Sequence, residues 1–284
     1  MTTIELIVIG DVHGLWDDVD ASFLEAREAT AIFVGDYGDE DVALVERLAS
    51  VRAPKVFTFG NHDAWHAMRG RGPREAVERQ LAAAGDEFIG YRALTVADDR
   101  LGLVGARPFS WGGAWFDGDF YQPLFGVRTM KDSADRIVGA ASTLPAHVPL
   151  VIIGHNGPRG LGTAPDSIWG RDFQSPPADW GDPDQEEALE RLRAAGRQVV
   201  AGVAGHMHER LMHGSGNRQR VALSNGTTFV NAAVVPRHRR GKRTILRHFV
   251  ELQIELQIEG ASVHATDIWV DDRGHVAAQK RLTA

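Results

Sequence analysis

The sequence predicts an α/β protein whose first part is built mainly from parallel strands. Short apolar runs rich in β-branched residues recur along the chain, among them residues 4–9 and 150–153, and they have the length of buried strands. The first few of these runs are separated by segments with apolar residues at helical spacing, such as residues 41–49. Strands that alternate with helices are typical of parallel βαβ units.

Five of the apolar runs end in a glycine that is followed by Asp, Asn or His. The sequences at these ends are Gly10-Asp11-Val12-His13, Gly35-Asp36-Tyr37-Gly38-Asp39, Gly60-Asn61-His62-Asp63, Gly154-His155 and Gly205-His206-Met207-His208. Glycine permits a sharp turn and a close backbone approach at the point where a ligand must be presented. Because active sites in open α/β sheets lie at the carboxyl ends of strands, we expect the functional site at these five positions.

Helices are expected where apolar residues recur at helical spacing behind a capping residue. The expected helices cover residues 17–27, 41–49, 74–84, a segment from Asp132 or Ser133 to Leu144, and residues 185–195. Pro73 stands before the third of them and Gly85 ends it.

Strands and turns are expected in the other segments. Short strands are predicted between Tyr91 and Gly105, and beyond Val221 the chain is expected to contain only strands and turns. Residues 251–258 repeat one pattern of alternating charged or polar and apolar residues, which predicts one long amphipathic strand. A hairpin is expected at residues 271–274.

Two segments have no clean period, residues 106–131 and residues 157–183. The first holds many aromatic residues among glycines, and it is either a packed surface loop or a lid that faces the substrate. A basic cluster at residues 237–243 is expected to form a solvated turn between strands rather than an anion-binding patch.

Composition limits the classes of function. The chain has 284 residues, a net charge of −7 and no cysteine, so any metal must take nitrogen and oxygen ligands. The negative charge disfavours a nucleic-acid partner, because phosphate backbones attract basic surfaces. No signal-like segment precedes Ile4 and no apolar run approaches membrane-spanning length, so we expect a cytoplasmic protein without a membrane partner.

The five motifs, in this order, resemble those of the calcineurin-like metallophosphoesterase superfamily, and they extend from residue 10 to residue 208. Residues 155–162 also look like a cyanobacterial and plastid-type branch of that family. The resemblance implies a four-layer α/β/β/α sandwich. We expect residues 1–284 to form a single domain of this kind, with residues 106–131 and 157–183 inserted as loops near the active site.

The resemblance also implies a dinuclear metal centre. The first metal would be held by Asp11, His13, Asp36 and His208, and the second by Asp36, Asn61, His155 and His206. A shared carboxylate can hold two cations roughly 3.5–4 Å apart, and a hydroxide that bridges them can attack phosphorus in line. This mixed donor set suits Mn, Fe or Zn.

Two further residues receive catalytic roles from the resemblance. His62 would protonate the leaving oxygen as a general acid, and Asp39 would orient its imidazole. Asp63 is expected to fix the turn through backbone hydrogen bonds instead.

The chain departs from the protein phosphatase branch of the family, in which arginines clamp the phosphate. Glu40 and Trp65 stand at the positions of those arginines, which disfavours a phosphoprotein phosphatase. Four arginines of the two aperiodic segments could replace them, although each is expected to be a surface arginine instead: Arg107, Arg128, Arg159 and Arg171.

The leading hypothesis is therefore a dimetal phosphoesterase that acts on a small phosphodiester or phosphomonoester. The alternatives are a nuclease, which the net charge disfavours, and a phosphoprotein phosphatase. A metal-free binding scaffold is the weakest alternative, because all seven expected ligands are present.

Overall fold

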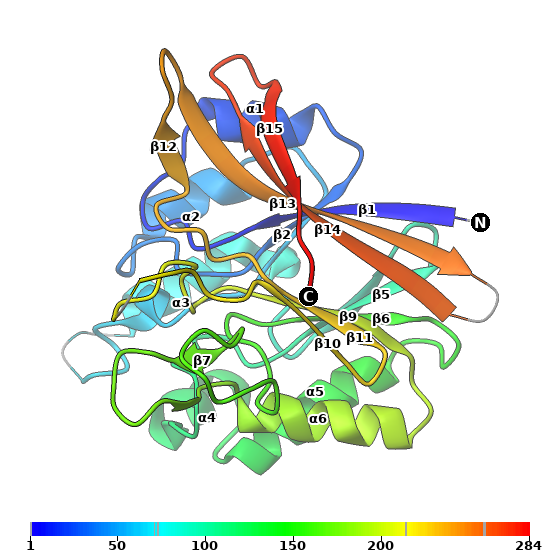
Figure 1. Cartoon of the computed structure of the whole chain (residues 1–284). Helices are drawn as coiled ribbons and strands as arrows, with labels where there is room; N and C mark the ends of the chain where they lie inside the picture. The colour runs from blue at the N-terminus through cyan, green and yellow to red at the C-terminus, as the bar shows by residue number, and fades with distance from the viewer. Residues whose placement is uncertain (1, 71, 73, 214, 258–259) are drawn as a thin grey trace.

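The structure is a computed structural model that describes residues 2–70, 72, 74–213, 215–257 and 260–284. The sequence predictions made for Pro73 and Ile258 lie outside the described residues. The described chain forms two mixed sheets that face each other, with helices on their outer faces, as Figure 1 shows.

The first sheet is ordered β15-β14-β13-β1-β2-β3, and β12 pairs with β13. Its strands are β1 (Thr2–Ile9), β2 (Thr30–Phe33), β3 (Lys55–Phe57), β12 (His238–Arg240), β13 (Ile245–Gln257), β14 (Gly260–Val270) and β15 (Val276–Arg281). The pairs β1–β2 and β2–β3 are parallel, as the alternation of strands and helices predicts. The strands from β12 to β15 are antiparallel to their neighbours, and the expected hairpin joins β14 to β15.

The second sheet is ordered β10-β11-β9-β6-β5-β4. Its strands are β4 (Ala93–Val96), β5 (Leu101–Gly105), β6 (Leu150–Ile153), β9 (Val199–Ala204), β10 (Val221–Ser224) and β11 (Thr227–Asn231). The central strands β5, β6, β9 and β11 are parallel, and β4 and β10 are antiparallel edges. A small separate pair consists of β7 (Gly170–Arg171) and β8 (Ala178–Asp179).

The helices form the two outer layers. They are α1 (Asp18–Glu25), α2 (Val42–Ala49), α3 (Glu75–Ala84), α4 (Gly118–Phe125), α5 (Met130–Ser142) and α6 (Pro183–Ala194), with single 3-10 turns at His62–Ala64 and Gly85–Glu87. In Figure 1, α1, α2 and α3 lie on the side of the first sheet, whereas α4, α5 and α6 lie beneath the second. The resulting order of helix, sheet, sheet and helix confirms the expected four layers.

The alternation of side chains along β1 explains why both of its faces are apolar. Leu6 and Val8 pack in the cluster between the two sheets, where they join residues such as Leu103 and Val151 of the second sheet. Ile7 and the other odd-numbered apolar residues of β1 belong to the cluster beneath the helices. Successive side chains of a strand point to opposite faces, so a strand covered on both faces reads as a continuous apolar run.

Two expectations about the central region are wrong. Residues 106–131 are not a loop throughout, because they contain α4, whose helical period is obscured by Pro123 and by aromatic residues on several faces. Helix α5 begins at Met130 rather than at residue 132 or 133, because the side chain of Thr129 caps it in a reciprocal pair with Asp132.

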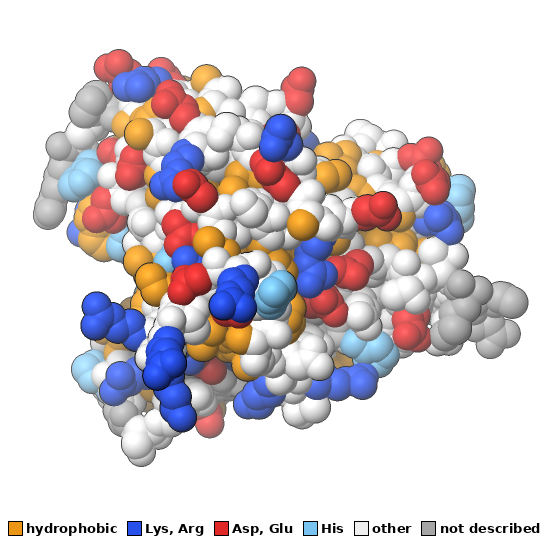
Figure 2. Space-filling model, turned by 90° about the horizontal axis from the view of Figure 1, so that it is seen from above, with side chains coloured by type: hydrophobic (Ala, Val, Ile, Leu, Met, Phe, Trp, Pro, Cys, Tyr) orange, Lys and Arg blue, Asp and Glu red, His pale blue; other side chains and the backbone are white. Residues whose placement is uncertain are grey.

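The expectation of a solvated turn at residues 237–243 is also wrong in part. Residues 238–240 form β12, and Arg237 is buried, with its guanidinium 2.8 Å from the carboxylate of Asp20. This arginine therefore ties the second half of the chain to α1. Figure 2 shows basic and acidic side chains mixed over much of the face seen from above. No described helix combines the length and the apolar composition that a membrane span requires.

Candidate metal centre

The carboxyl ends of strands from both sheets meet at one place. Asp11, Asp36 and Asn61 follow β1, β2 and β3 of the first sheet, and His155 and His206 follow β6 and β9 of the second. The loops at these ends are tied together by backbone hydrogen bonds, because the N–H groups of residues 12 and 13 both donate to the carbonyl of Asp36, at 2.9 and 2.8 Å. The structure therefore brings together the residues that the sequence placed at separate strand ends.

Three of the expected ligands have left-handed backbone conformations. The φ angles are 43° at His13, 52° at Asp36 and 65° at His206. Such angles are uncommon for residues other than glycine, and they cluster at functional sites because the surrounding structure must hold them. The backbone here is bent so that these side chains turn toward a common centre.

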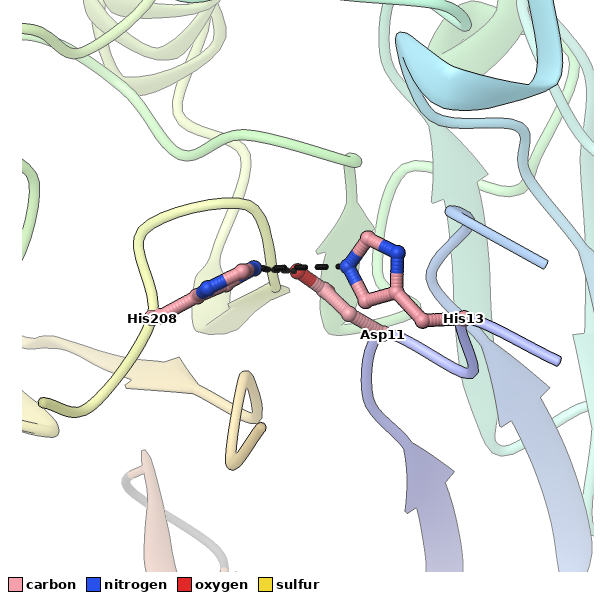
Figure 3. A group of neighbouring side chains, drawn as sticks. All are labelled: Asp11, His13 and His208. Carbon is pink, nitrogen blue, oxygen red and sulfur yellow. Dashed lines mark hydrogen bonds and ion pairs between the residues drawn. The ribbon is translucent and has the colours of Figure 1, made fainter. Parts of the chain in front are cut away.

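The first group of donors consists of Asp11, His13 and His208, whose ligand atoms lie within 4.8 Å of one another. The Nε2 atoms of the two imidazoles are 3.4 Å apart, and Nε2 of His208 is 3.4 Å from Oδ2 of Asp11. Figure 3 shows the three side chains pointing toward one another, Asp11 and His13 from the loop after β1 and His208 from the loop after β9. Ligands of a cation bound at 2.0–2.2 Å are about 3–3.5 Å apart, so this donor set fits a divalent metal.

The second group consists of Asp36, His155 and His206, also within 4.8 Å. Nε2 of His155 lies 3.1 Å from Oδ1 of Asn61 and 3.3 Å from Oδ1 of Asp36. The other ring nitrogen of His155, Nδ1, is 2.8 Å from the carbonyl of Val34, to which it donates. That bond orients the ring and leaves Nε2 directed at the group, the usual arrangement for a metal-binding histidine.

Asp36 lies between the two groups. Its Oδ1 faces His155, and its Oδ2 is 3.8 Å from Nε2 of His13. Burial raises the pKa of the Asp36 carboxyl, but His155 beside it more than offsets this effect and holds the pKa well below the usual range. Burial and the neighbouring His155 lower the pKa of His206 to about 3. Asp36 is therefore ionised and His206 neutral, the states in which both groups bind a cation.

Glycines before the ligands leave room for this close packing. A Cβ on Gly60 would lie 2.1 Å from Oδ1 of Asp36 and 2.5 Å from the ring of His155. A Cβ on Gly205 would lie 2.1 Å from Oδ1 of Asp11. The close approach expected from the sequence at these strand ends is therefore confirmed at both positions.

Asp63 holds the turns beneath the site, as expected. Its buried carboxylate accepts hydrogen bonds from the backbone N–H groups of Asp36, Tyr37 and Gly60, at 2.9, 2.8 and 2.7 Å. One carboxylate thus joins the loop after β2 to the loop after β3, on which Asn61 and His62 lie.

His62 and Asp39 form a pair beside the donors. Nδ1 of His62 is 2.6 Å from Oδ1 of Asp39. A nitrogen of the same imidazole lies within 4.8 Å of ligand atoms of His13 and Asp36. The ring thus borders the donor groups and is oriented from behind by a carboxylate.

A pocket of about 430 Å³ opens above the donors. Its floor contains Asp36, His62 and His208, and its walls are largely apolar. The apolar residues of the lining are Trp65, Trp111, Phe173, Trp180, Met207 and Met212. The two loops expected near the site contribute Trp111, Phe173 and Trp180 to these walls.

The arginines of this pocket are not those expected. Among the described residues, the lining takes its arginines from Arg69, Arg210 and Arg218. Arg107 lies neither at the surface, as expected, nor in the pocket lining, because it is buried between Asp182 and Asp184, 3.0 Å from each carboxylate. Arg69 was missed because no motif contains it, although it lies four residues beyond Trp65, one helical turn away.

The family profile of calcineurin-like phosphoesterases matches residues 4–210, a range that includes all five motifs. The chain belongs to this family. The expected class, phosphoric ester hydrolases, is thereby confirmed at the level of the family. The two groups of donor atoms in this calcineurin-like phosphoesterase are consistent with metal binding. No curated protein matches the chain.

The solved structures that match this chain have low sequence identity to it. A candidate 5′-nucleotidase from Staphylococcus aureus is 14% identical, with a TM-score of 0.52. The alignment covers 92% of this chain and 53% of the nucleotidase, so this chain spans about half the length of that protein. A phosphopantetheinyl hydrolase from Mycobacterium tuberculosis is 15% identical over 81% of this chain and 88% of the other, with a TM-score of 0.44. A predicted phosphoesterase from Streptococcus pneumoniae is 12% identical over 100% and 99%, with a TM-score of 0.37.

Proposed function

We propose that this protein hydrolyses the ester bond of a small phosphomonoester or phosphodiester with the help of two divalent cations, one on each side of Asp36. The observation that carries the proposal is the position of Asp36, whose two carboxylate oxygens face donors of two different groups. We propose Asp11, His13 and His208 as further ligands of one cation, and Asn61, His155 and His206 of the other. Mn, Fe and Zn all suit this set of donors.

When bound, the cations would lower the pKa of water and neutralise charge on the phosphate oxygens. In the reaction, water gives up a proton to the solvent and its oxygen bonds to phosphorus, while the bond between phosphorus and the alcohol oxygen breaks. His62 gives a proton to that departing oxygen. Asp39, 2.6 Å from Nδ1 of His62, holds the ring in place.

The test is hydrolysis of p-nitrophenyl phosphate and bis-p-nitrophenyl phosphate by protein that is stripped of metal and then reloaded with Mn. We expect turnover that depends on the metal, together with two bound equivalents by elemental analysis. The variant Asp36→Asn keeps the shape of the side chain but loses its charge, so it should bind less metal and lose turnover by orders of magnitude.

Asp41→Asn is the matched control, because Asp41 caps α2 and asparagine caps a helix equally well. This variant should keep the activity and metal content of the unchanged protein. Metal-independent turnover, or full activity in Asp36→Asn, would contradict the proposal. The ratio of monoester to diester turnover then assigns the substrate class.

A further inference from the structure

We propose that the pocket beside His62 is an aromatic subsite, which binds a planar ring on the alcohol portion of the phosphate ester. The inference rests on the proposed function for the identity of the reacting group. The ring preference itself is a property of the pocket walls and can be measured by binding alone.

One wall of the subsite begins at His62, the proposed general acid. The ring of Trp65 stacks on the imidazole of His62 with centroids 4.5 Å apart and planes 16° apart. Trp111 continues the stack at 4.9 Å and 19° from Trp65. A series of nearly parallel rings therefore leads from the donor groups into the pocket.

The other wall comes from the loop at residues 157–183 and from the segment after β9. Phe173 and Trp180 pack edge to face with centroids 5.3 Å apart, and both line the pocket. The side chains of Phe173 and Met212 are 38% and 71% exposed, respectively. Large apolar side chains that stay exposed beside a functional site are typical of ligand-binding surfaces.

The position of His62 determines which part of a substrate meets these rings. A general acid must lie next to the leaving oxygen, so the alcohol portion extends from the phosphate on the side of His62. Trp65 and Trp111 occupy that side. The alcohol portion is therefore the part that contacts the aromatic wall, and a flat ring can pack against such side chains in an edge-to-face or offset arrangement.

Cationic side chains frame the same pocket. The guanidinium of Arg69 lies 3.7 Å from the ring centroid of Trp65 and 4.7 Å from that of Trp111, and Arg210 also lines the pocket. Arg218 is already paired with Asp172 at 3.0 Å. Arg69 holds Trp65 and Trp111 in place through cation–π contacts, and its positive charge attracts an anionic ester. The subsite thus suits an aromatic and negatively charged ligand.

Two matched ligand pairs test the inference on the Mn-loaded protein. Benzylphosphonate and cyclohexylmethylphosphonate are not hydrolysed and differ in the flat ring, so their Kd values are compared by calorimetry. Adenosine 5′-monophosphate and ribose 5-phosphate share the leaving oxygen and differ in the base, so their kcat/KM values are compared. Stacking on an aromatic side chain predicts a preference of about tenfold to hundredfold for the aromatic member.

A preference in both pairs identifies aryl groups in general as the ligand of the subsite, and a preference in the nucleotide pair alone identifies a nucleobase. In Trp111→Leu, the ratio between the aromatic and the non-aromatic member of each pair should fall toward one. Phe173→Leu changes a 38% exposed residue of the same lining, and it should reduce the preference without any loss of folding. Trp269→Leu is the control, because Trp269 is a tryptophan of β14 with Arg239 over its ring, outside the pocket lining.

If the two phosphonates have equal Kd values and the two 5′-phosphates have equal kcat/KM values, in a protein that hydrolyses p-nitrophenyl esters, the aromatic subsite is overturned. The proposed function is left intact by that result. An aromatic preference in binding that persists in Trp111→Leu and Phe173→Leu would also overturn it. Conversely, a preference that these variants remove, in a protein that hydrolyses no ester, would support the subsite and contradict the proposed function.

Discussion

The indole N–H of Trp180 donates a hydrogen bond of 2.8 Å to the carbonyl of Trp111. The N–H of Gly113 donates in return to the carbonyl of Trp180 at 2.7 Å. Gly112 has a φ of 75°, and a Cβ there would lie 2.3 Å from the indole of Trp180. These contacts join the segment at residues 106–131 to the loop at residues 157–183, so the two walls of the pocket are held together before any ligand binds.

Gly60→Ala should weaken metal binding. The added Cβ would lie 2.1 Å from Oδ1 of Asp36 and 2.5 Å from the ring of His155, so both groups must move. We expect metal content and turnover to fall at least tenfold, measured by elemental analysis and with bis-p-nitrophenyl phosphate. Gly139→Ala is the control, because Gly139 lies within α5 with nothing near its missing Cβ, and alanine there should stabilise the helix by about 1 kcal/mol. Normal metal content in Gly60→Ala would refute the close packing described for this site.

His62→Ala should lower kcat more for poor leaving groups than for good ones. General acid catalysis contributes about 10²–10⁴-fold when the departing oxygen needs a proton, and p-nitrophenolate needs none. The measurement is a comparison of kcat for p-nitrophenyl phosphate and for a simple alkyl phosphate. Asp39→Asn should show the same pattern with a smaller loss, because His62 remains. An equal loss for both esters would argue that His62 is not the acid.

Arg107→Met should destabilise the protein without a specific effect on phosphate binding. Arg107 is buried between Asp182 and Asp184, and its removal leaves two buried carboxylates without their cation. Breaking such a buried pair costs about 3–5 kcal/mol, which urea unfolding can measure. Arg69→Met, in the pocket wall, should instead raise KM with little change in stability. If Arg107→Met raised KM and left the free energy of unfolding unchanged, Arg107 would instead act as a phosphate clamp.

His248 should make the protein less stable in mild acid. Burial lowers the pKa of His248 to about 4, although its Nε2 lies 2.8 Å from the carboxylate of Asp267. The unfolded chain, with a histidine pKa of about 6.5, therefore takes up a proton that the folded chain does not. Stability is full above pH 6.5 and falls as the pH drops from about 6.5 to about 4, by on the order of 2–3 kcal/mol.

The matching experiment is urea unfolding of metal-free protein at pH 7 and at pH 4.5. His248→Gln keeps a side-chain donor for Asp267 but cannot titrate, so it should lose less stability between these two pH values. His147→Gln, a change at an exposed histidine, should behave as the unchanged protein does. An identical loss in His248→Gln and in the unchanged protein would show that His248 does not titrate in this range.

The sequence alone indicated strands that alternate with helices, and its resemblance to the calcineurin-like family implied the two-sheet sandwich and the position of the candidate metal centre. Apolar runs of strand length and helical spacing follow from local geometry, so they are visible without a structure. The glycines before Asp11, Asn61 and His206 mark strand ends where backbone and ligands pack closely, and the contacts of Gly60 and Gly205 explain why no larger residue stands there.

Only the tertiary structure decided the chemistry of the pocket walls. Trp65 and Trp111 stack on each other from segments that no local period connects, and Arg69 lies over both of their rings. The burial of Arg107 was not foreseen for the same reason, since Asp182 and Asp184 are more than 70 positions away along the chain. Local sequence patterns report which residues share a strand or a helix. They do not report which distant side chains meet, because that depends on how the two sheets pack together.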